Sequence, residues 1–281
     1  MPVIAVVGTK GGVSKSTTSM ALAIWMAKLR PEHRFLLVDG DMHVRTVELK
    51  MCSVHDVTLK DVLSGDKPWG EAVYTCELEK GGELMYPNLA VLPAGGRFLP
   101  PMRGNPLVYL DITKRVFEQM INGLRERFKY IIIDTPASIS LEHLILTASA
   151  DAVLYVCEPN DDSVNSTLAS AEALKDFMEA QTLGVMLSRV PADIELKRWT
   201  TKAEKIAHIL GTVPEDPKVG EAFRENLPVV AAYPDCQASL AMKDITRKIL
   251  EIKIKRAEMS PKVNQGLLKV MERIKKGAEK P

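Results

Sequence analysis

The stretch Gly8-Thr-Lys-Gly-Gly-Val-Ser-Lys-Ser-Thr-Thr18 decides the fold of this chain of 281 residues. Residues 2–7 before it are apolar, as in a buried strand, and residues 19–29 after it are typical of a helix. In such a strand, turn and helix, glycines let backbone N–H groups surround phosphate oxygens, and the helix start adds partial positive charge. The stretch therefore predicts a phosphate-binding loop.

Two side chains of this loop indicate what kind of phosphate compound it binds. Lys15 is placed to reach the outer phosphates, and Ser16 is placed to ligate Mg²⁺. We therefore expect a nucleoside triphosphate with Mg²⁺, and an ordinary glycine-rich turn is the alternative interpretation. The residues expected to contact the nucleotide are Gly8, Thr9, Lys10, Gly11, Gly12, Val13, Ser14, Lys15, Ser16 and Thr17.

The loop departs from the strict pattern G-x-x-x-x-G-K-[ST] at Ser14, which stands where the second glycine is expected. If this position requires a positive φ, a serine there costs on the order of 1 kcal/mol, which a folded protein tolerates. We therefore keep the prediction of a phosphate site and expect the departure to affect the rate of any reaction there.

The rest of the chain alternates between strand and helix patterns, which predicts a parallel, doubly wound α/β sheet with right-handed crossovers. Ligands of such sheets bind at the carboxyl ends of the strands, and Gly8, Asp39, Asp41 and Asp134 fall at such ends. Strands are expected at 34–38, 89–92, 130–134, 151–156, 182–188 and near 212, and helices at 58–64, 107–128, 140–148, 163–180, 195–210 and 238–258.

The segment Lys10-Gly-Gly-Val-Ser-Lys-Ser-Thr17 resembles the deviant Walker A motif, K-G-G-x-G-K-[ST], of the MinD/ParA family of dimerising ATPases, with MinD-like members the nearest. In that family the first lysine of the motif reaches the ATP of the partner subunit. The resemblance implies this role for Lys10, and it implies ATP and Mg²⁺ as cofactors. It extends from about residue 2 to about residue 250.

Three further segments resemble the segments that form the nucleotide site in this family. Residues 34–41 are similar to the switch I strand and residues 129–137 to Walker B and the start of switch II. Residues 211–217 are similar to the loop that lies over the adenine. The resemblance implies that Ser16, Asp39 and Asp134 serve Mg²⁺, that Lys10, Lys15 and Asp41 are catalytic, with Asp41 orienting the attacking water, and that Arg189, Pro214, Glu215 and Asp216 lie near the base.

Three serines depart from the family pattern. Ser14 replaces the loop glycine, and Ser138 stands where the family's D-x-P-A-G has glycine. Both positions take part in sensing the γ-phosphate in this family, so we expect the chain to hydrolyse ATP slowly. Ser188 precedes Arg189 where an Asn-Arg pair usually meets the base, so the preference for adenine is implied mainly by the resemblance.

Composition limits the classes of function that the chain can have. The sequence is 46% hydrophobic, which suffices for a sizeable core in one α/β domain. A formal net charge of +1 excludes a nucleic-acid binder that is basic over its whole surface. No run of about 18 apolar residues occurs, and the first residues lead directly into a strand, so we expect neither a membrane span nor a signal peptide and a cytoplasmic location.

The cysteines indicate no metal centre. They contain no C-x-x-C pair, and we expect reduced, mostly structural thiols. Iron–sulfur proteins of the same fold are the alternative, because they hold a cluster with paired or subunit-bridging cysteines. The histidines show no metal-ligand spacing either. The residues concerned are Cys52, Cys76, Cys157 and Cys236, and His33, His43, His55, His143 and His208.

The C-terminal segment predicts an appendage, so we divide the chain into an ATPase domain, 1–258, and a tail, 259–281. Residues 262–281 contain six Lys or Arg against two Glu, and their apolar side chains share one helical face. Such a basic amphipathic helix can lie on an anionic membrane, and it resembles the membrane-targeting helix that ends MinD proteins. A terminal helix that packs on the domain is the alternative. The apolar side chains are Leu267, Leu268, Met271 and Ile274.

These features together predict a nucleotide-switched homodimer in which each subunit gives Lys10 to the other's ATP. With two tails per dimer, it would organise partners at the inner face of the cell membrane and answer to an activating protein that the sequence does not identify. The alternatives are a nucleotide-binding scaffold with little hydrolysis and a ParA-like DNA-segregation ATPase, which we favour less. In the latter, Arg247, Lys248, Lys253, Lys255 and Arg256 would hold DNA phosphates on the last long helix.

Overall fold

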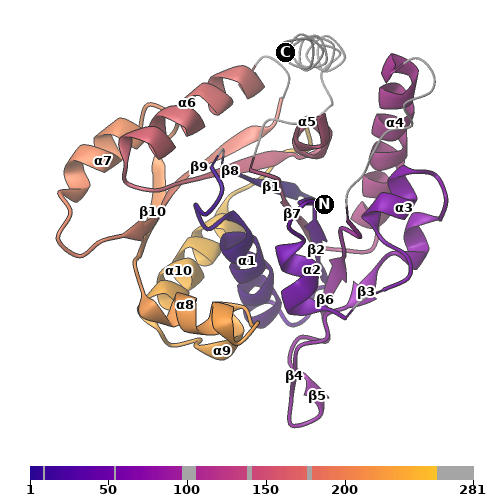
Figure 1. Ribbon diagram of the computed structural model, residues 1–281, viewed down its shortest axis with the longest axis horizontal. Helices are drawn as coiled ribbons and strands as arrows, with labels where there is room; N and C mark the ends of the chain where they lie inside the picture. Colours follow the sequence, from indigo (N-terminus) through magenta and orange to yellow (C-terminus); the bar gives the residue numbers. More distant parts are fainter. Residues whose placement is uncertain (9, 54, 97–105, 138–140, 176–178, 258–281) are drawn as a thin grey trace, which may run out of the picture.

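The computed structural model describes residues 1–281 except 9, 54, 97–105, 138–140, 176–178 and 258–281. Within the described residues the core is an eight-stranded sheet of order β10-β9-β8-β1-β7-β2-β6-β3, parallel except for the edge strand β3 (Figure 1). Its strands are β1 (Val3–Val7), β2 (Phe35–Asp39), β3 (Tyr74–Thr75), β6 (Leu89–Leu92), β7 (Tyr130–Asp134), β8 (Ala152–Cys157), β9 (Gln181–Val190) and β10 (Ile209–Pro214).

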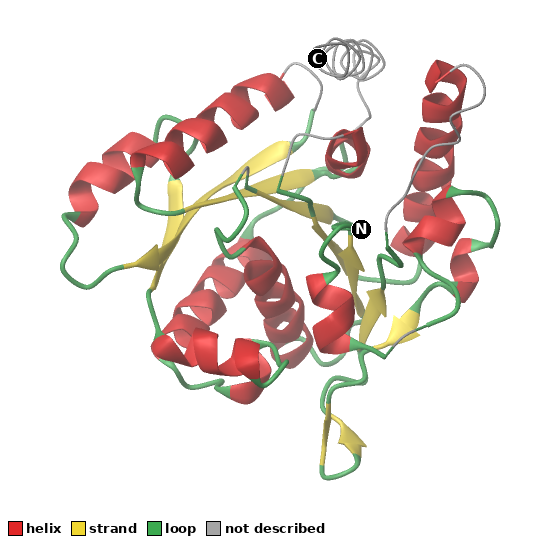
Figure 2. Ribbon diagram, viewed as in Figure 1, coloured by secondary structure: helices red, strands yellow, loops and turns green. Residues whose placement is uncertain are grey.

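Helices cover both faces of this sheet (Figure 2). This is why the central strands are continuous apolar runs that are buried along their whole length. One layer consists of α1 (Lys15–Leu29), α2 (Thr46–Met51), α8 (Pro217–Arg224), α9 (Val229–Ala232) and α10 (Gln237–Glu251). The other consists of α3 (Leu59–Leu63), α4 (Pro106–Arg125), α5 (Leu141–Ala148), α6 (Asp161–Lys175) and α7 (Leu196–Ala203).

Helix α1 lies centrally in its layer and is buried on almost every side. Its indole group Trp25 Nε1 donates a hydrogen bond to the carbonyl oxygen of Ser239 in α10, at 3.1 Å. Because α1 begins at Lys15, this packing fixes the position of the glycine-rich loop that precedes it. Outside the layers are a short 3₁₀ helix (Trp69–Glu71) and a hairpin of β4 (Glu79–Lys80) and β5 (Glu83–Leu84), which extends from the lower side of the molecule in Figure 1.

The register of the sheet positions the two carboxylates predicted for magnesium. Strand β7 pairs with β1 and with β2, and in the second pairing Asp39 and Asp134 are direct partners. Both residues end their strands, so they lie at the same edge of the sheet as the loop that follows β1. The predicted doubly wound α/β fold and the gathering of these residues at the carboxyl ends are confirmed.

Several predicted helices are wrong in extent, and two of them are instructive. The helix expected over 195–210 ends at Ala203, because His208 already pairs with β9 through its carbonyl oxygen, which accepts from Val185 N at 2.9 Å. The helix expected to reach 258 ends at Glu251. The backbone of Ile252 is extended, and over residues 252–255 half-buried Ile alternates with exposed Lys.

Some predictions concern residues outside the described part of the chain. The tail 259–281 is among them, so its helical form and its membrane binding stay predictions. Among the described residues, no helix combines the length and the apolar character needed to cross a bilayer.

Candidate nucleotide-binding site

The glycine-rich loop leaves β1 after Val7 and turns into α1 at Lys15. Ser14 is the N-cap of α1 and has a φ of 69°, so the condition under which a serine is strained at this position is met. Gly12 has a φ of 85°. A Cβ atom at Gly8 would lie 2.6 Å from the carbonyl oxygen of Val156 on β8, so the loop starts at a position that admits only glycine.

The two lysines of the loop have different surroundings. Lys15 is buried, and its Nζ donates to the carbonyl oxygen of Lys10 at 3.1 Å, so the ammonium group lies within the loop. Burial lowers the pKa of Lys15, and the nearby carboxylates of Asp134 and Asp41 oppose this shift. The side chain of Lys10 is half-exposed and forms an ion pair with Asp162 at the start of α6, at 3.1 Å.

The carboxylates of Asp39 and Asp134 are fully buried. Asp39 accepts hydrogen bonds from the backbone N–H groups of Asp41, at 3.2 Å, and Glu48, at 2.9 Å. Burial and the neighbouring Asp134 nevertheless raise the pKa of Asp39 well above its ordinary value. Burial also raises the pKa of Asp134 to about 6, although hydrogen bonds from the hydroxyl groups of Ser16 and Ser19 oppose the shift.

These carboxylates fit a divalent cation. Asp134 Oδ2 is buried and has no hydrogen-bond partner among the described residues, so it is an acceptor available for a metal-bound water. Ser16 is the second residue of α1, and its hydroxyl group donates a hydrogen bond to Asp134, which places it beside this carboxylate. No group of three or more His, Cys, Asp or Glu in the described part of the chain could hold a metal alone, and Mg²⁺ in nucleotide sites takes few protein ligands besides phosphate and water.

Asp41 lies past the end of β2 and is partly exposed. Its Oδ1 accepts from the backbone N–H groups of His43, at 3.1 Å, and Val44, at 3.2 Å, which fixes the orientation of the carboxylate. Gly40 between the two aspartates donates its N–H to the carbonyl oxygen of Asp134 at 2.9 Å. A Cβ atom at Gly40 would lie 2.4 Å from that oxygen, so only glycine permits the two strand ends to come this close.

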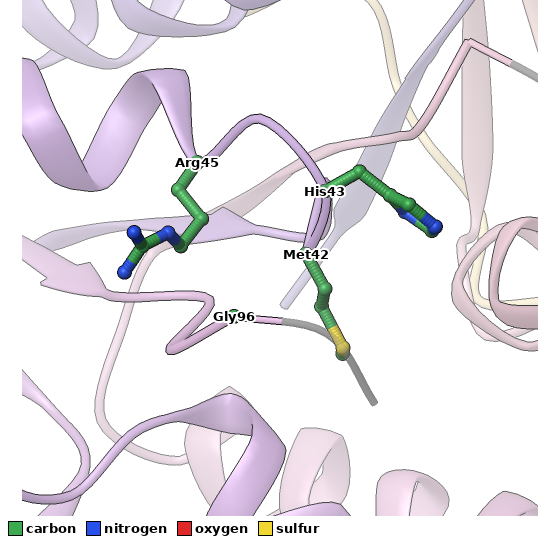
Figure 3. Close-up of a pocket in the computed structure, with 4 residues that line it drawn as sticks. All are labelled: Met42, His43, Arg45 and Gly96. Atoms are coloured by element: carbon green, nitrogen blue, oxygen red, sulfur yellow. The ribbon is translucent and has the colours of Figure 1, made fainter. Parts of the chain in front are cut away.

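A pocket of about 540 Å³ adjoins Asp41 and is lined by Met42, His43, Arg45 and Gly96. Figure 3 shows the side chains of Arg45 and His43 pointing in opposite directions from this turn, with Met42 between them. Glu48 of α2 connects the two sides of the pocket. Its buried carboxylate accepts from Gly95 N at 2.8 Å and pairs with Arg45 at 3.4 Å.

The residues predicted near the base form a second group, at the carboxyl ends of β9 and β10. Arg189 has a φ of 52° and forms ion pairs with Glu158, at 3.0 Å, and Glu215, at 3.9 Å. Pro214 ends β10, and Asp216 caps α8 by accepting from Lys218 N at 2.9 Å. The structure therefore brings Arg189, Pro214 and Glu215 together and uses the Asp216 side chain to start a helix.

Ser188 does not belong to this second group, because its side chain is buried beneath the phosphate loop. The Ser188 hydroxyl donates to the carbonyl oxygen of Val13 at 2.9 Å, from a residue 175 positions away. This serine therefore supports the loop rather than facing a base. The contacts predicted for Thr9 and Ser138 lie outside the described residues.

Sequence reasoning missed several residues that shape the site. They are Gly40, Glu48, Ser19, which donates to Asp134 Oδ1 at 2.9 Å, and Asp162. Gly40 could have been found, because a glycine between two aspartates at a strand end is a signal of close backbone approach. The other three act through contacts that no local pattern encodes.

A phosphate loop between the first strand and first helix of a doubly wound parallel sheet, with a buried aspartate at the end of the neighbouring strand, places the chain among the P-loop nucleoside triphosphatases. Comparison with known proteins narrows this class. The sequence model of the family described as an AAA domain matches residues 1–183.

The chain is similar to an uncharacterized ATP-binding protein of Methanocaldococcus jannaschii, with 30% identity covering 89% of this chain and 88% of that protein. It is similar to the septum site-determining protein MinD of Helicobacter pylori, with 29% identity over 92% of this chain and 94% of that one. The structure of the Pyrococcus furiosus cell division ATPase MinD superposes with a TM-score of 0.72 at 25% identity, covering 90% of this chain and 99% of that one.

The chain therefore belongs to the MinD/ParA family of P-loop ATPases. ATP and Mg²⁺ are the cofactors of that family and of this chain.

Proposed function

We propose that this chain is a slow ATPase of MinD type that forms a homodimer around ATP and acts as a nucleotide-switched spatial organiser at the cytoplasmic face of the membrane. The observation that carries the proposal is the different placement of the two loop lysines. Lys15 directs its ammonium group into its own loop, whereas Lys10 directs its ammonium group out of the loop to an exposed carboxylate. A lysine in the second position can be transferred to the nucleotide of another subunit.

In this proposal each residue of the site has a defined task. The N–H groups from Gly8 to Thr17 and the Lys15 ammonium group bind the phosphates. Ser16 and Asp134 hold Mg²⁺, Asp134 through water, with Asp39 beside them, and the bound ion neutralises charge on the phosphates. Asp41 orients the attacking water, since its carboxylate is already held by backbone N–H groups. Arg189, Pro214, Glu215 and Asp216 border the base.

The same contacts supply a route for the switch. The hydrogen bond from Gly40 N to Asp134 O joins the end of β2 to the end of β7. Asp39 also accepts from Glu48 N of α2. Loss of the γ-phosphate would release Asp41 and the segment that leads into α2, because the water and the metal no longer tie these carboxylates to the nucleotide.

The spatial role rests on the tail and on the family. The relatives include septum site-determining proteins, and residues 262–281 have the composition of a membrane-surface helix. The tails of an ATP-bound dimer act together, so membrane binding would follow the nucleotide state. A DNA-segregation role is less well supported, because two of the cations proposed to bind DNA already have partners. Lys248 donates to the carbonyl oxygen of Leu210, and Arg247 pairs with Asp244.

The test is dimerisation in solution. Lys10→Ala in an Asp41→Ala background, in which turnover is slowed, should bind ATP as a monomer and fail to dimerise. Light scattering with ATP and Mg²⁺ measures the molecular mass, and the Asp41→Ala protein with Lys10 intact is the control. Dimers that persist without Lys10 would contradict the proposal.

A further inference from the structure

The chain between α10 and the tail forms a strap, residues 252–257, whose two sides differ in chemistry. Ile252 and Ile254 pack against the core cluster beneath α1 and α10. Lys253 and Lys255 alternate with them and are exposed. This alternation of half-buried and exposed residues places the two lysines on the same, outward side of the chain. The strap therefore presents a row of positive charge on its outer side.

Contacts at both ends hold the strap in place. At its start, Ile252 N donates to the carbonyl oxygen of Ile249, the last hydrogen bond of α10. At its end, Ala257 N donates to Asp151 Oδ1 at 3.0 Å, and Arg256 donates to Asn122 Oδ1 of α4 at 2.9 Å. The strap is thus arranged before any ligand binds, so binding costs little conformational entropy.

Asp151 is a firm anchor for this end of the strap. Its carboxylate is buried and accepts from Val3 N at 2.7 Å, and it pairs with the guanidinium group of Arg125, whose Nη2 lies 2.9 Å from Oδ1. Arg125 is consequently neutralised, and the positive charge at this edge of the sheet comes from the strap itself.

The two lysines of the strap differ from the other cations of this region in their pairing. Within the described residues, neither Lys253 nor Lys255 forms an ion pair, in contrast to Arg247 of α10, which pairs with Asp244. Both lysines line a pocket of about 650 Å³ together with Arg256, Gln181 and Glu179. Three cations against one carboxylate make this concave surface suitable for anionic groups.

We propose that the basic strap is a second membrane-contact surface, which binds the phosphate groups of anionic lipids next to the point where the tail begins. The inference rests on the proposed function, because it takes the tail to enter the membrane. The tail follows the strap directly and has apolar side chains at Leu267, Leu268, Met271 and Ile274. A bilayer accepts such side chains and a DNA duplex does not, so the observations favour a membrane over nucleic acid.

The experiment compares full-length variants in vesicle co-sedimentation with ATP and Mg²⁺. The strap variant is Lys253→Gln with Lys255→Gln. The matched control is Lys197→Gln with Lys205→Gln, which removes the same charge from exposed positions outside the strap. The vesicles consist of phosphatidylcholine alone or of phosphatidylcholine mixed with phosphatidylglycerol. A third variant, Leu268→Glu with Met271→Glu, tests the tail separately.

Each neutralised lysine should weaken binding to the anionic vesicles roughly fivefold, so the strap variant should bind about 25-fold more weakly than the parent. Binding to phosphatidylcholine, ATP hydrolysis without lipid and the thermal unfolding midpoint should not change, and the control should bind like the parent. Equal binding of the strap variant and the parent would overturn the inference.

The tail variant distinguishes failure of the proposed membrane role from failure of the inference about the strap. If it loses vesicle binding while the strap variant retains it, the proposed function stands and the inference fails. If the tail variant binds like the parent, the tail does not enter the membrane and the proposed membrane role fails. Salt-dependent retention of duplex DNA that is lost in the strap variant, with vesicle binding unchanged, would make the strap a nucleic-acid surface and overturn the inference.

Discussion

Lys10 Nζ lies 3.1 Å from Asp162 Oδ2, although 152 residues separate the two in the chain. The pair holds the loop's first lysine on its own subunit, at the start of α6. Both side chains are accessible to solvent, at 45% and 82% exposure, so the pair is weak enough to break when a better partner arrives. Transfer of Lys10 to a second subunit must break it.

Asp162→Asn should therefore strengthen ATP-dependent dimerisation. Each exposed ion pair is worth up to about 1 kcal/mol and two of them break when a dimer forms, so the dissociation constant of the dimer should fall by up to about 30-fold. Light scattering over a range of protein concentrations measures this constant.

Asp161→Asn is the control, because the neighbouring carboxylate pairs with Lys202 and Arg198 and not with Lys10. Weaker dimerisation in the Asp162 variant would show that this carboxylate assists the dimer rather than retaining Lys10 in the monomer.

Lys15→Ala should abolish tight ATP binding. The Lys15 ammonium group is the buried cation of the loop, and loss of charge-assisted hydrogen bonds to phosphate should weaken affinity on the order of a hundredfold. Titration calorimetry measures the affinity, and the far-UV circular dichroism spectrum should match the parent. A variant that binds ATP like the parent would exclude this loop as the phosphate site.

Ser14→Gly should raise the rate of ATP hydrolysis. At a φ of 69° a serine is strained by on the order of 1 kcal/mol, and glycine relieves the strain and lets the backbone adjust to the transferred phosphate. Ser14→Ala is the control, because it removes the hydroxyl and keeps the strain. Steady-state release of phosphate measures the rate. If both variants hydrolyse ATP like the parent, the backbone at position 14 does not limit turnover.

Asp134→Asn should stabilise the nucleotide-free protein near pH 7.5 and have roughly half that effect near pH 5. Burial raises the pKa of folded Asp134 to about 6, from about 3.8 in the unfolded chain. The ionised carboxylate thus costs stability that is absent at low pH, grows between these two pKa values and is complete above pH 6. The cost is about 3 kcal/mol. Denaturant unfolding of the parent and the variant at both pH values measures this difference in the free energy of unfolding. Equal differences at pH 7.5 and pH 5 would contradict the raised pKa of Asp134.

The central strands of the sheet were predicted more accurately than the helices and strands at its edges. Residues 89–92 and 130–134 were predicted with the observed bounds, because an apolar run that ends in a turn or a carboxylate has one interpretation. The 195–210 segment was misjudged, since its apolar spacing fits a helix and only pairing with β9 draws Ile209 into the sheet. Helices α2, α8 and α9 are too short to show a period.

The candidate site also contains some residues that the sequence predicted and others that it did not. Its strand-end carboxylates were predictable, because parallel strands bring their carboxyl ends to one edge. The placement of the Ser188 side chain was not predictable, because its contact with Val13 depends on how β9 packs beneath the loop. Contacts across 115 residues, such as that of Ser19 with Asp134, are properties of the folded chain and not of any local pattern.

The register that makes Asp39 and Asp134 partners has a calorimetric consequence. Burial and the closeness of the two carboxylates raise the pKa of Asp39 and raise the pKa of Asp134 to about 6, so near pH 6 Asp134 is partly protonated where a free aspartate is ionised, and a bound divalent cation opposes this protonation. Loading of ATP with Mg²⁺ should therefore release protons to the solvent. The observed binding enthalpy would then vary linearly with the ionisation enthalpy of the buffer, and its slope would count the protons displaced.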